Sequence, residues 1–337
     1  MSCKCAVSVE IKALGIWVLL IMACCCLDLT NVLDMYTFGH APDAFRFRHQ
    51  WCFRLSNKFV SMAASSSAAR KRKADEAFQR KEENRATIAD TLMRCGRELD
   101  LKRVRRAHVC LLPGAQRRVE RSIVPCVARA VVQTDVRDAD CVAVARELSQ
   151  LSGARVWMLN MASPTCPVGG VLAGCNAQEE HLCRCSNLLL HLTRAAVDGC
   201  YPLHSGGGEV PDFKILVHKG IVVFKDPEDY FLLSREQRFG VGVLTAAAEK
   251  VHGGRSLGRN AFRFIQYLMD VAEMQGGTHL VLSAWGCGAF GQSPLEVAQC
   301  FQRVLAQTLG NLQVVFAIKD DHNSEGNLQA FKTVFGK

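Results

Sequence analysis

From about residue 120 to the C-terminus, the chain alternates between short apolar segments and longer amphipathic ones. Seven short segments are apolar throughout, as strands buried on both faces of a sheet usually are: 128–134, 155–159, 214–218, 221–224, 241–246, 279–285 and 313–319. Five longer segments read as amphipathic helices: 138–151, 178–192, 258–274, 293–309 and 327–335. This order predicts an α/β domain in which a mixed or largely parallel sheet lies between helices.

Length and composition agree with a globular protein of this class. The chain has 337 residues, which is enough for one large domain or two smaller ones. Hydrophobic residues make up 49% of the chain and charged residues 22%, so a core can be built without difficulty. The formal net charge of +9 favours partners that carry phosphate without identifying one.

The first 61 residues do not follow the alternating pattern. Residues 13–27 form an unbroken apolar run that is shorter than the about 20 residues needed to span a bilayer, but it suits the core of a signal peptide. No clean cleavage site follows the run, and Met62 begins a plausible N-terminus of its own. We expect residues 1–61 to be a weakly structured extension or to precede the true start of translation.

Residues 62–79 are expected to form a basic linker. This segment contains Arg70-Lys71-Arg72-Lys73, which is typical of a nuclear-localisation signal and equally of the solvated start of a charged helix. Both interpretations stay open. We expect a location in the nucleus or cytoplasm, with secretion or membrane anchoring as the alternative if residues 13–27 are translated and used.

Cysteine is frequent, with 17 copies, but its spacing does not indicate a metal site. No C-x-x-C pair follows Met62, and the closest approach to a metal pattern, at His181, Cys183 and Cys185, lacks the usual zinc spacing. We expect reduced thiols that pack as small buried hydrophobes, which favours a reducing compartment. No metal and no cofactor are expected.

Residues 286–291 read GCGAFG and lie between a predicted strand and a predicted helix. The letters fit the dinucleotide fingerprint G-x-G-x-x-G, but that fingerprint follows the first strand of its fold and is followed by an acidic residue about 20 positions on. Here the loop lies near the chain end, and the position twenty further on is Asn311. A hydride-transferring enzyme is therefore excluded, and what remains is a glycine loop whose amides suit an anionic group.

A second glycine loop precedes two adjacent carboxylates. Gly169 and Gly170 follow the strand at 155–159, and Glu179 and Glu180 lie in the first turn of the next helix. Acidic residues in a first turn ordinarily complement the helix dipole. Two glycine loops near one carboxylate pair could also hold a diphosphate beside a sugar that awaits acid-assisted cleavage.

The sequence VGGVLAGCNAQEE (168–180) resembles the signature of the poly(ADP-ribose) glycohydrolases, in which three glycines precede Gln-Glu-Glu. AWGCGAFG (284–291) is similar to the diphosphate-binding loop of that family. Three further segments resemble its microbial branch: RATIADTL (85–92), YPL (201–203) and VVFKD (222–226). The resemblance covers roughly residues 80–335, and it implies a catalytic domain over 80–337 with a macrodomain fold, a mixed sheet between helices.

The resemblance also implies the roles of individual residues. Glu180 is expected to be the general acid/base that cleaves the ribose–ribose bond of poly(ADP-ribose), releasing ADP-ribose, and Glu179 the carboxylate that hydrogen-bonds the terminal ribose. The implied substrate-binding residues are Ser163, Gly169, Gly170, Val171, Gln178, Trp285, Gly286, Cys287, Gly288, Ala289 and Phe290. Adjacent carboxylates in a partly dry cleft are expected to raise the pKa of one of them, which keeps a proton available near neutral pH.

The chain departs from the family pattern at two places. Val168 stands where the first glycine is expected, so a positive φ there would strain the backbone and its bulk could crowd a phosphate. The glycine-rich loop 204–213 has no match. A non-catalytic ADP-ribose-binding macrodomain is therefore the alternative function. In either case the expected partners are poly(ADP-ribose) or ADP-ribosylated proteins, as in the DNA damage response, with a monomeric protein and no sequence-specific binding of nucleic acid.

Overall fold

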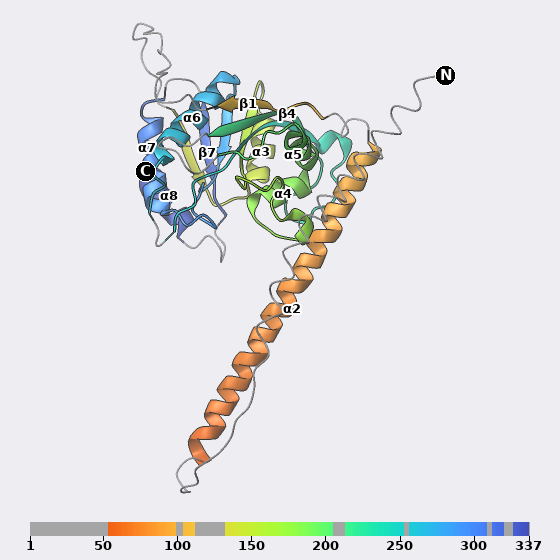
Figure 1. The fold of residues 1–337 in the computed structure, drawn as a ribbon, viewed down its shortest axis with the longest axis vertical. Helices are drawn as coiled ribbons and strands as arrows, with labels where there is room; N and C mark the ends of the chain where they lie inside the picture. The colour runs from red at the N-terminus through yellow and green to blue at the C-terminus, as the bar shows by residue number, and fades with distance from the viewer. Residues whose placement is uncertain are drawn as a thin grey trace, which may run out of the picture. The chain divides into compact units, whose positions relative to one another are not determined.

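The computed structural model describes residues 53–98, 104–111, 132–204, 213–252, 256–308, 312–319 and 326–336 (Figure 1). The chain divides into two compact units, Met1–Phe78 and Gln79–Lys337. The apolar run at 13–27 and most of the loop 204–213 lie outside the described residues. Their roles, and the domain limits expected from the sequence, stay predictions.

The second unit is built on a seven-stranded sheet with the order β1-β4-β5-β3-β6-β7-β2. The strands are β1 (His108–Leu111), β2 (Thr134–Arg137), β3 (Val156–Met161), β4 (Lys214–Val223), β5 (Phe239–Ala246), β6 (His279–Leu282) and β7 (Gln313–Ala317). The five strands from β5 to β2 in this order are parallel to one another. At one edge, β4 pairs antiparallel with β5, and β1 pairs antiparallel with β4. The predicted mixed sheet is confirmed.

Helices cover both faces of this sheet (Figure 1). They are α3 (Cys141–Ser149), α4 (Gln178–Cys185), α5 (Leu188–Val197), α6 (Ala261–Met274), α7 (Pro294–Leu305) and α8 (Asn327–Phe335). A further helix, α2 (Phe53–Arg97), contributes only its C-terminal part to this unit. Alternate side chains of β3 enter two different cores, because successive residues of a strand point to opposite faces. Trp157 packs with α6, α7 and α8, and Met158 packs with α3, α4 and α5. The predicted sandwich of a sheet between helices is therefore confirmed.

Two predicted segments have different boundaries in the structure. The two strands predicted at 214–218 and 221–224 are one strand, β4, whose register shifts between His218 and Ile221. The single helix predicted at 178–192 is two helices, because Ser186 takes an extended conformation between them. Its hydroxyl donates to Leu182 O at 2.7 Å, and the side chain of Asn187 accepts from Val222 N, so the break is held by β4.

The N-terminal segments also differ from the prediction. Helix α2 begins at Phe53, so the end of the segment expected to be weakly structured and the whole basic linker at 62–79 are helical. Lys71, Arg72 and Lys73 are exposed on this helix, as the charged-helix interpretation expects. The strand predicted at 128–134 begins only at Thr134, and the short edge strand β1 was missed. Among the described residues, no helix combines the length and apolarity needed to cross a membrane.

The part of α2 that belongs to the second unit packs on it through one face. Asn84, Ile88, Thr91 and Cys95 are buried, at the three- and four-residue spacing of a helix face. Lys225, only 2% exposed, donates to Thr87 O at 3.1 Å and pairs with Asp90 at 2.8 Å. This pairing contributes to the lowered pKa of Asp90, although burial opposes it. The contact fixes the C-terminal part of α2 to the rest of the second unit.

We expect Lys225→Ala to lower the free energy of unfolding by about 2 kcal/mol, because it leaves Thr87 O and Asp90 without their buried donor. The effect stays below that of breaking a fully buried pair, since Asp90 is 40% exposed and can be hydrated. Urea unfolding measures it. The matched control is Lys219→Ala, an exposed lysine of β4, which should change stability by less than about 0.5 kcal/mol. Equal losses in the two variants would contradict this role of Lys225.

Candidate active site

The predicted site residues gather at the carboxyl ends of the parallel strands. The chain leaves β3 towards α4 on one face of the sheet, whereas it leaves β5 and β6 towards α6 and α7 on the other face. Neighbouring strands whose connections diverge in this way open a crevice above the sheet, where ligands of α/β proteins bind. The site is therefore expected above β3, between its two neighbours.

The first glycine loop comes within contact distance of the carboxylates. Gly169 has a φ of 53°, and a Cβ on it would lie 2.4 Å from Glu180 Oε1. A Cβ on Gly170 would lie 2.5 Å from Cys175 Sγ. Both distances are shorter than any side chain tolerates. Glycine is required at each position because the loop backbone lies directly against Glu180 and the loop that follows.

Val168 adopts the left-handed backbone that the family pattern assigns to glycine. Its φ is 64°, which is strained for a β-branched residue. The predicted strain is therefore confirmed. The side chain is 8% exposed and packs in the core with Val171 and Ile88, so little of it faces the crevice. The predicted crowding of a phosphate stays a prediction.

Glu180 is bound by backbone N–H groups on both of its oxygens. Gly170 N donates to Oε1 at 2.8 Å, and Ala177 N donates to Oε2 at 3.1 Å. The second bond caps α4, because Glu180 is the third residue of the helix and reaches back to the residue before it. The ordinary helix-start interpretation of this carboxylate is thus correct. The same bonds hold it, 6% exposed, against the glycine pair.

Glu179 lies beside both the end of β3 and the glycine loop, since a Cβ on Gly169 would be 3.1 Å from its Oε2. Its Oε1 accepts from Asn160 Nδ2 at 3.3 Å and its Oε2 from Ser163 N at 3.2 Å. The side chain is 3% exposed, and this burial raises the pKa of Glu179 to about 8, against the lowering effect of the two hydrogen bonds. The charge of Glu180 raises it further. The predicted rise of one pKa in the pair falls on Glu179.

Gln178 at the start of α4 and Asn160 at the end of β3 link the carboxylate pair to the sheet. The Oε1 of Gln178 accepts from Met161 N at 2.9 Å, and its Nε2 donates to Leu159 O at 2.7 Å. Gln178 therefore joins α4 to β3, and its predicted contact with a ribose stays a prediction. Asn160, which sequence reasoning missed, also donates to Thr245 Oγ1 at 3.2 Å. The only feature of the sequence that could have indicated Asn160 is its polar amide at the end of an apolar strand.

The second glycine loop presents mainly backbone. Gly286 has a φ of 86°, and Gly288 and Ala289 are exposed. Trp285 and Cys287 are 4% and 3% exposed and belong to the core, so only their backbone can line the crevice. Phe290 is half-buried and packs against the same core. Its predicted contact with a sugar stays a prediction.

Gln292 fixes this loop to the segment that follows β5. Its Nε2 donates to Glu249 O at 2.9 Å, and its Oε1 accepts from Gly258 N at 3.2 Å. Val251 N donates to Phe290 O at 2.8 Å across the same seam. Sequence reasoning missed Gln292, because its partners lie more than thirty residues away. The loops after β5 and β6 therefore form one unit beside the crevice.

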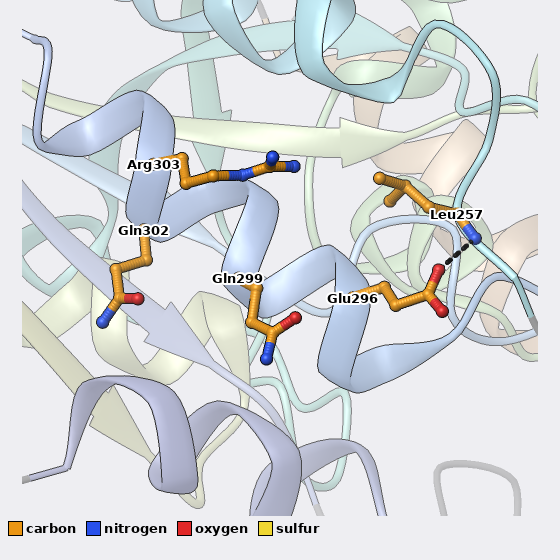
Figure 2. A pocket seen from close by; sticks show the side chains of 5 residues that line it. All are labelled: Leu257, Glu296, Gln299, Gln302 and Arg303. Carbon is orange, nitrogen blue, oxygen red and sulfur yellow. Dashed lines mark hydrogen bonds between the residues drawn. The ribbon is translucent and has the colours of Figure 1, made fainter.

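A hollow on α7 lies apart from these residues (Figure 2). Its lining residues are Leu257, Glu296, Gln299, Gln302 and Arg303. Glu296 Oε2 accepts from Leu257 N at 2.6 Å, so this carboxylate already serves the backbone. None of the predicted site residues lines the hollow. The carboxylate pair and the two glycine loops therefore remain the candidate active site.

We expect Val168→Gly to be more stable than Val168→Ala by about 1 kcal/mol, although both lose the buried side chain. Glycine relieves the positive φ, and alanine keeps the strain. Val171 in the same core has no positive φ, so Val171→Gly should be less stable than Val171→Ala by a similar amount. Urea unfolding of the four variants measures both differences. The same order at both positions would contradict the strain at Val168.

We expect the stability gained from Glu179→Gln to grow with pH. The folded protein keeps a proton on Glu179 up to about pH 8, whereas the unfolded chain releases it near the ordinary value of 4.5. Protonated Glu179 therefore contributes its full share to the unfolding free energy of the wild-type protein below about pH 4.5, and this share is lost as the pH rises through about 8. In that window, the unfolding free energy of the variant should rise relative to wild type by about 1.4 kcal/mol per pH unit.

Chemical unfolding at several pH values measures this difference, with the exposed Glu228→Gln as the control. The control should run parallel to wild type across the whole range. Parallel curves for Glu179→Gln as well would contradict the raised pKa.

Comparisons with known proteins point in one direction. The family model described as microbial-type PARG, catalytic domain, matches residues 55–226, which include the first glycine loop and the carboxylate pair. No curated protein matches the chain. Solved structures do.

Three of these are poly(ADP-ribose) glycohydrolases. The enzyme of Thermomonospora curvata with the inhibitor ADP-HPD is 25% identical, with a TM-score of 0.58, over 75% of this chain and 99% of that one. A second structure of that enzyme is 26% identical, with the same TM-score, over 75% and 100%. The enzyme of Deinococcus radiodurans in complex with ADP-ribose is 28% identical, with a TM-score of 0.51, over 61% and 85%. This chain belongs to the microbial-type poly(ADP-ribose) glycohydrolase catalytic-domain family, and it is a glycosidase of the hydrolase class.

Proposed function

We propose that this protein hydrolyses the ribose–ribose O-glycosidic bonds of poly(ADP-ribose) and releases ADP-ribose, with residues 80–337 as the catalytic domain. One observation carries the proposal. Glu180 is held by backbone N–H groups against a glycine pair that leaves no room for a Cβ, at the carboxyl ends of parallel strands. The related enzyme that was solved with ADP-ribose supports the choice of substrate.

The two glycine loops are suited to the diphosphate of this substrate. Glycines let the backbone approach an anion closely, and backbone N–H groups at loop and helix ends favour negative charge. Gly169 and Gly170 lie on one side, and Gly286 and Gly288 follow β6 on the other. We therefore assign the diphosphate to the second loop and the terminal ribose to the first, beside the carboxylates.

The reaction needs one acid, one base and one water. A carboxylic acid gives its proton to the glycosidic oxygen, the bond from C1 to that oxygen breaks, and the ribose passes through an oxocarbenium-like state. Water then attacks C1, and its proton returns to the same carboxylate. Both protons are accounted for, and the net change is the addition of one water.

We assign the acid/base role to Glu180, because its Oε1 lies at the glycine loop where the sugar is placed. Glu179 also lies near Gly169, and its oxygens accept from Asn160 Nδ2 and Ser163 N. Its raised pKa keeps a proton on Glu179 near neutral pH, beside Glu180. We therefore assign two roles to Glu179: it hydrogen-bonds the ribose hydroxyls, and it retains a proton beside Glu180.

We expect Glu180→Gln to lower kcat on poly(ADP-ribose) by about 100- to 10,000-fold, because glutamine can neither give nor take the proton. Glutamine keeps an acceptor for one of the two backbone donors, so the Kd for ADP-ribose should change by less than about fivefold. Release of ADP-ribose measures kcat, and calorimetry measures Kd. The exposed Glu228→Gln is the control.

Two other outcomes have clear meanings. Undiminished turnover by Glu180→Gln would remove Glu180 from the acid/base role. A wild-type protein that binds ADP-ribose but releases none from the polymer would be a non-catalytic reader, the alternative that Val168 raises.

A further inference from the structure

Arg184 is a buried cation whose partners are neutral. It lies on α4 one turn after Glu180 and is 0% exposed. Its Nη1 donates to Cys175 O at 2.8 Å, its Nη2 to Asn176 Oδ1, and its Nε to Tyr230 OH at 3.2 Å. Burying a guanidinium on neutral acceptors costs folding free energy. Its contacts therefore call for a role other than stability.

These contacts hold the loop that leads into the carboxylate pair. Arg184 binds Cys175 and Asn176, which directly precede Ala177, the donor to Glu180 Oε2. On the other side of the loop, Asn84 of α2 donates to Gly174 O at 3.0 Å. A Cβ on Gly174 would lie 2.4 Å from Lys81 O, so α2 also limits the loop sterically. The loop is thus clamped between α2 and Arg184.

Tyr230 fixes Arg184 from behind. Its hydroxyl accepts from Arg184 Nε, and its ring lies 5.4 Å from the guanidinium carbon. Tyr230 has a φ of 59°, and Val168 is the other residue besides glycine with a positive φ in the described part of the chain. Such strain persists where the surrounding structure holds a residue for function. Both strained residues contact elements that present Glu180.

The network ends at the start of α3. His181 Nδ1 lies 2.9 Å from Tyr230 OH, and His181 Nε2 lies 3.1 Å from Asp140 Oδ2. The other oxygen of Asp140 accepts from Val142 N at 2.8 Å and caps that helix. These bonds connect Arg184 to α3, which lies on the same face of the sheet as α4, and so hold its side chain in one orientation.

We propose that Arg184 and Tyr230 are positioning residues for Glu180. They set the loop 174–177 so that Ala177 N and Gly170 N hold the carboxylate aimed at the crevice, and this role rests on the proposed function of Glu180. Neither residue touches the substrate. A loop that shifts by about 1 Å would lower the chemical step by up to about 100-fold while the binding surfaces stay in place.

The test is Tyr230→Phe, which removes the hydroxyl and keeps the ring and its packing. We expect kcat on poly(ADP-ribose) to fall by about tenfold, with the Kd for ADP-ribose within twofold of wild type. Tyr267→Phe, on α6, is the control, because it removes a hydroxyl bond, to Leu111 O, that is not part of this network. It should leave both quantities unchanged. Equal kcat values for Tyr230→Phe and wild type would overturn the proposal.

A second pair of variants separates positioning from mere folding. Arg184→Lys keeps the charge but cannot reach three acceptors, so it should recover part of the kcat that Arg184→Gln loses, at equal folded fractions by circular dichroism. If kcat follows only the folded fraction, the role of Arg184 is structural and the proposal fails.

Hydrogen exchange tests the network without any turnover. The amide of Ala177 should exchange at least about tenfold faster in Tyr230→Phe than in wild type or Tyr267→Phe, because its carboxylate acceptor is released. Unchanged exchange would overturn the positioning role. If the wild-type protein shows no turnover but the Ala177 amide still exchanges faster in Tyr230→Phe than in wild type, only the proposed function is contradicted.

Discussion

The hydrogen bond from Gly170 N to Glu180 Oε1, at 2.8 Å, is the contact on which the rest of the site depends. It brings a loop that follows β3 against the first turn of the next helix, so a Cβ on Gly169 would nearly coincide with the carboxylate. The backbone there must turn through positive φ at two successive residues. The bond from Ala177 N to Glu180 Oε2 holds the other oxygen of the same carboxyl group.

The molecule accepts local costs to maintain it. Val168 is strained, Tyr230 is strained, and Arg184 buries its charge on neutral oxygens. Each of these features would weaken a protein that was selected for stability alone. They converge on one short loop and on one helix start, whereas the two cores on either side of the sheet consist of well-packed apolar side chains. Such a concentration of broken local rules is expected at a functional site.

Much of this could be predicted from the sequence, because apolar runs and helical spacing are local signals. The last helix, 327–335, has the predicted bounds, and the positive φ of Val168 follows from the glycine that the family pattern requires there. What could not be predicted depends on distant partners. Ser186 breaks a helix because Asn187 binds β4, and Asn160 and Gln292 gain their roles from residues that only the folded sheet brings close. The burial of the Trp285 side chain in the core could not be predicted from its place in the glycine loop either.

The start of α4 explains how two adjacent carboxylates acquire different chemistry. Successive residues of a helix point about 100° apart, so the two carboxyl groups meet different hydrogen-bond donors although both lie near Gly169. Glu179 enters a dry environment at the end of β3, where burial raises its pKa to about 8. Glu180 meets two backbone N–H groups beside the glycines. One helix terminus thus places a carboxyl group with a raised pKa beside a carboxyl group that two backbone N–H groups hold.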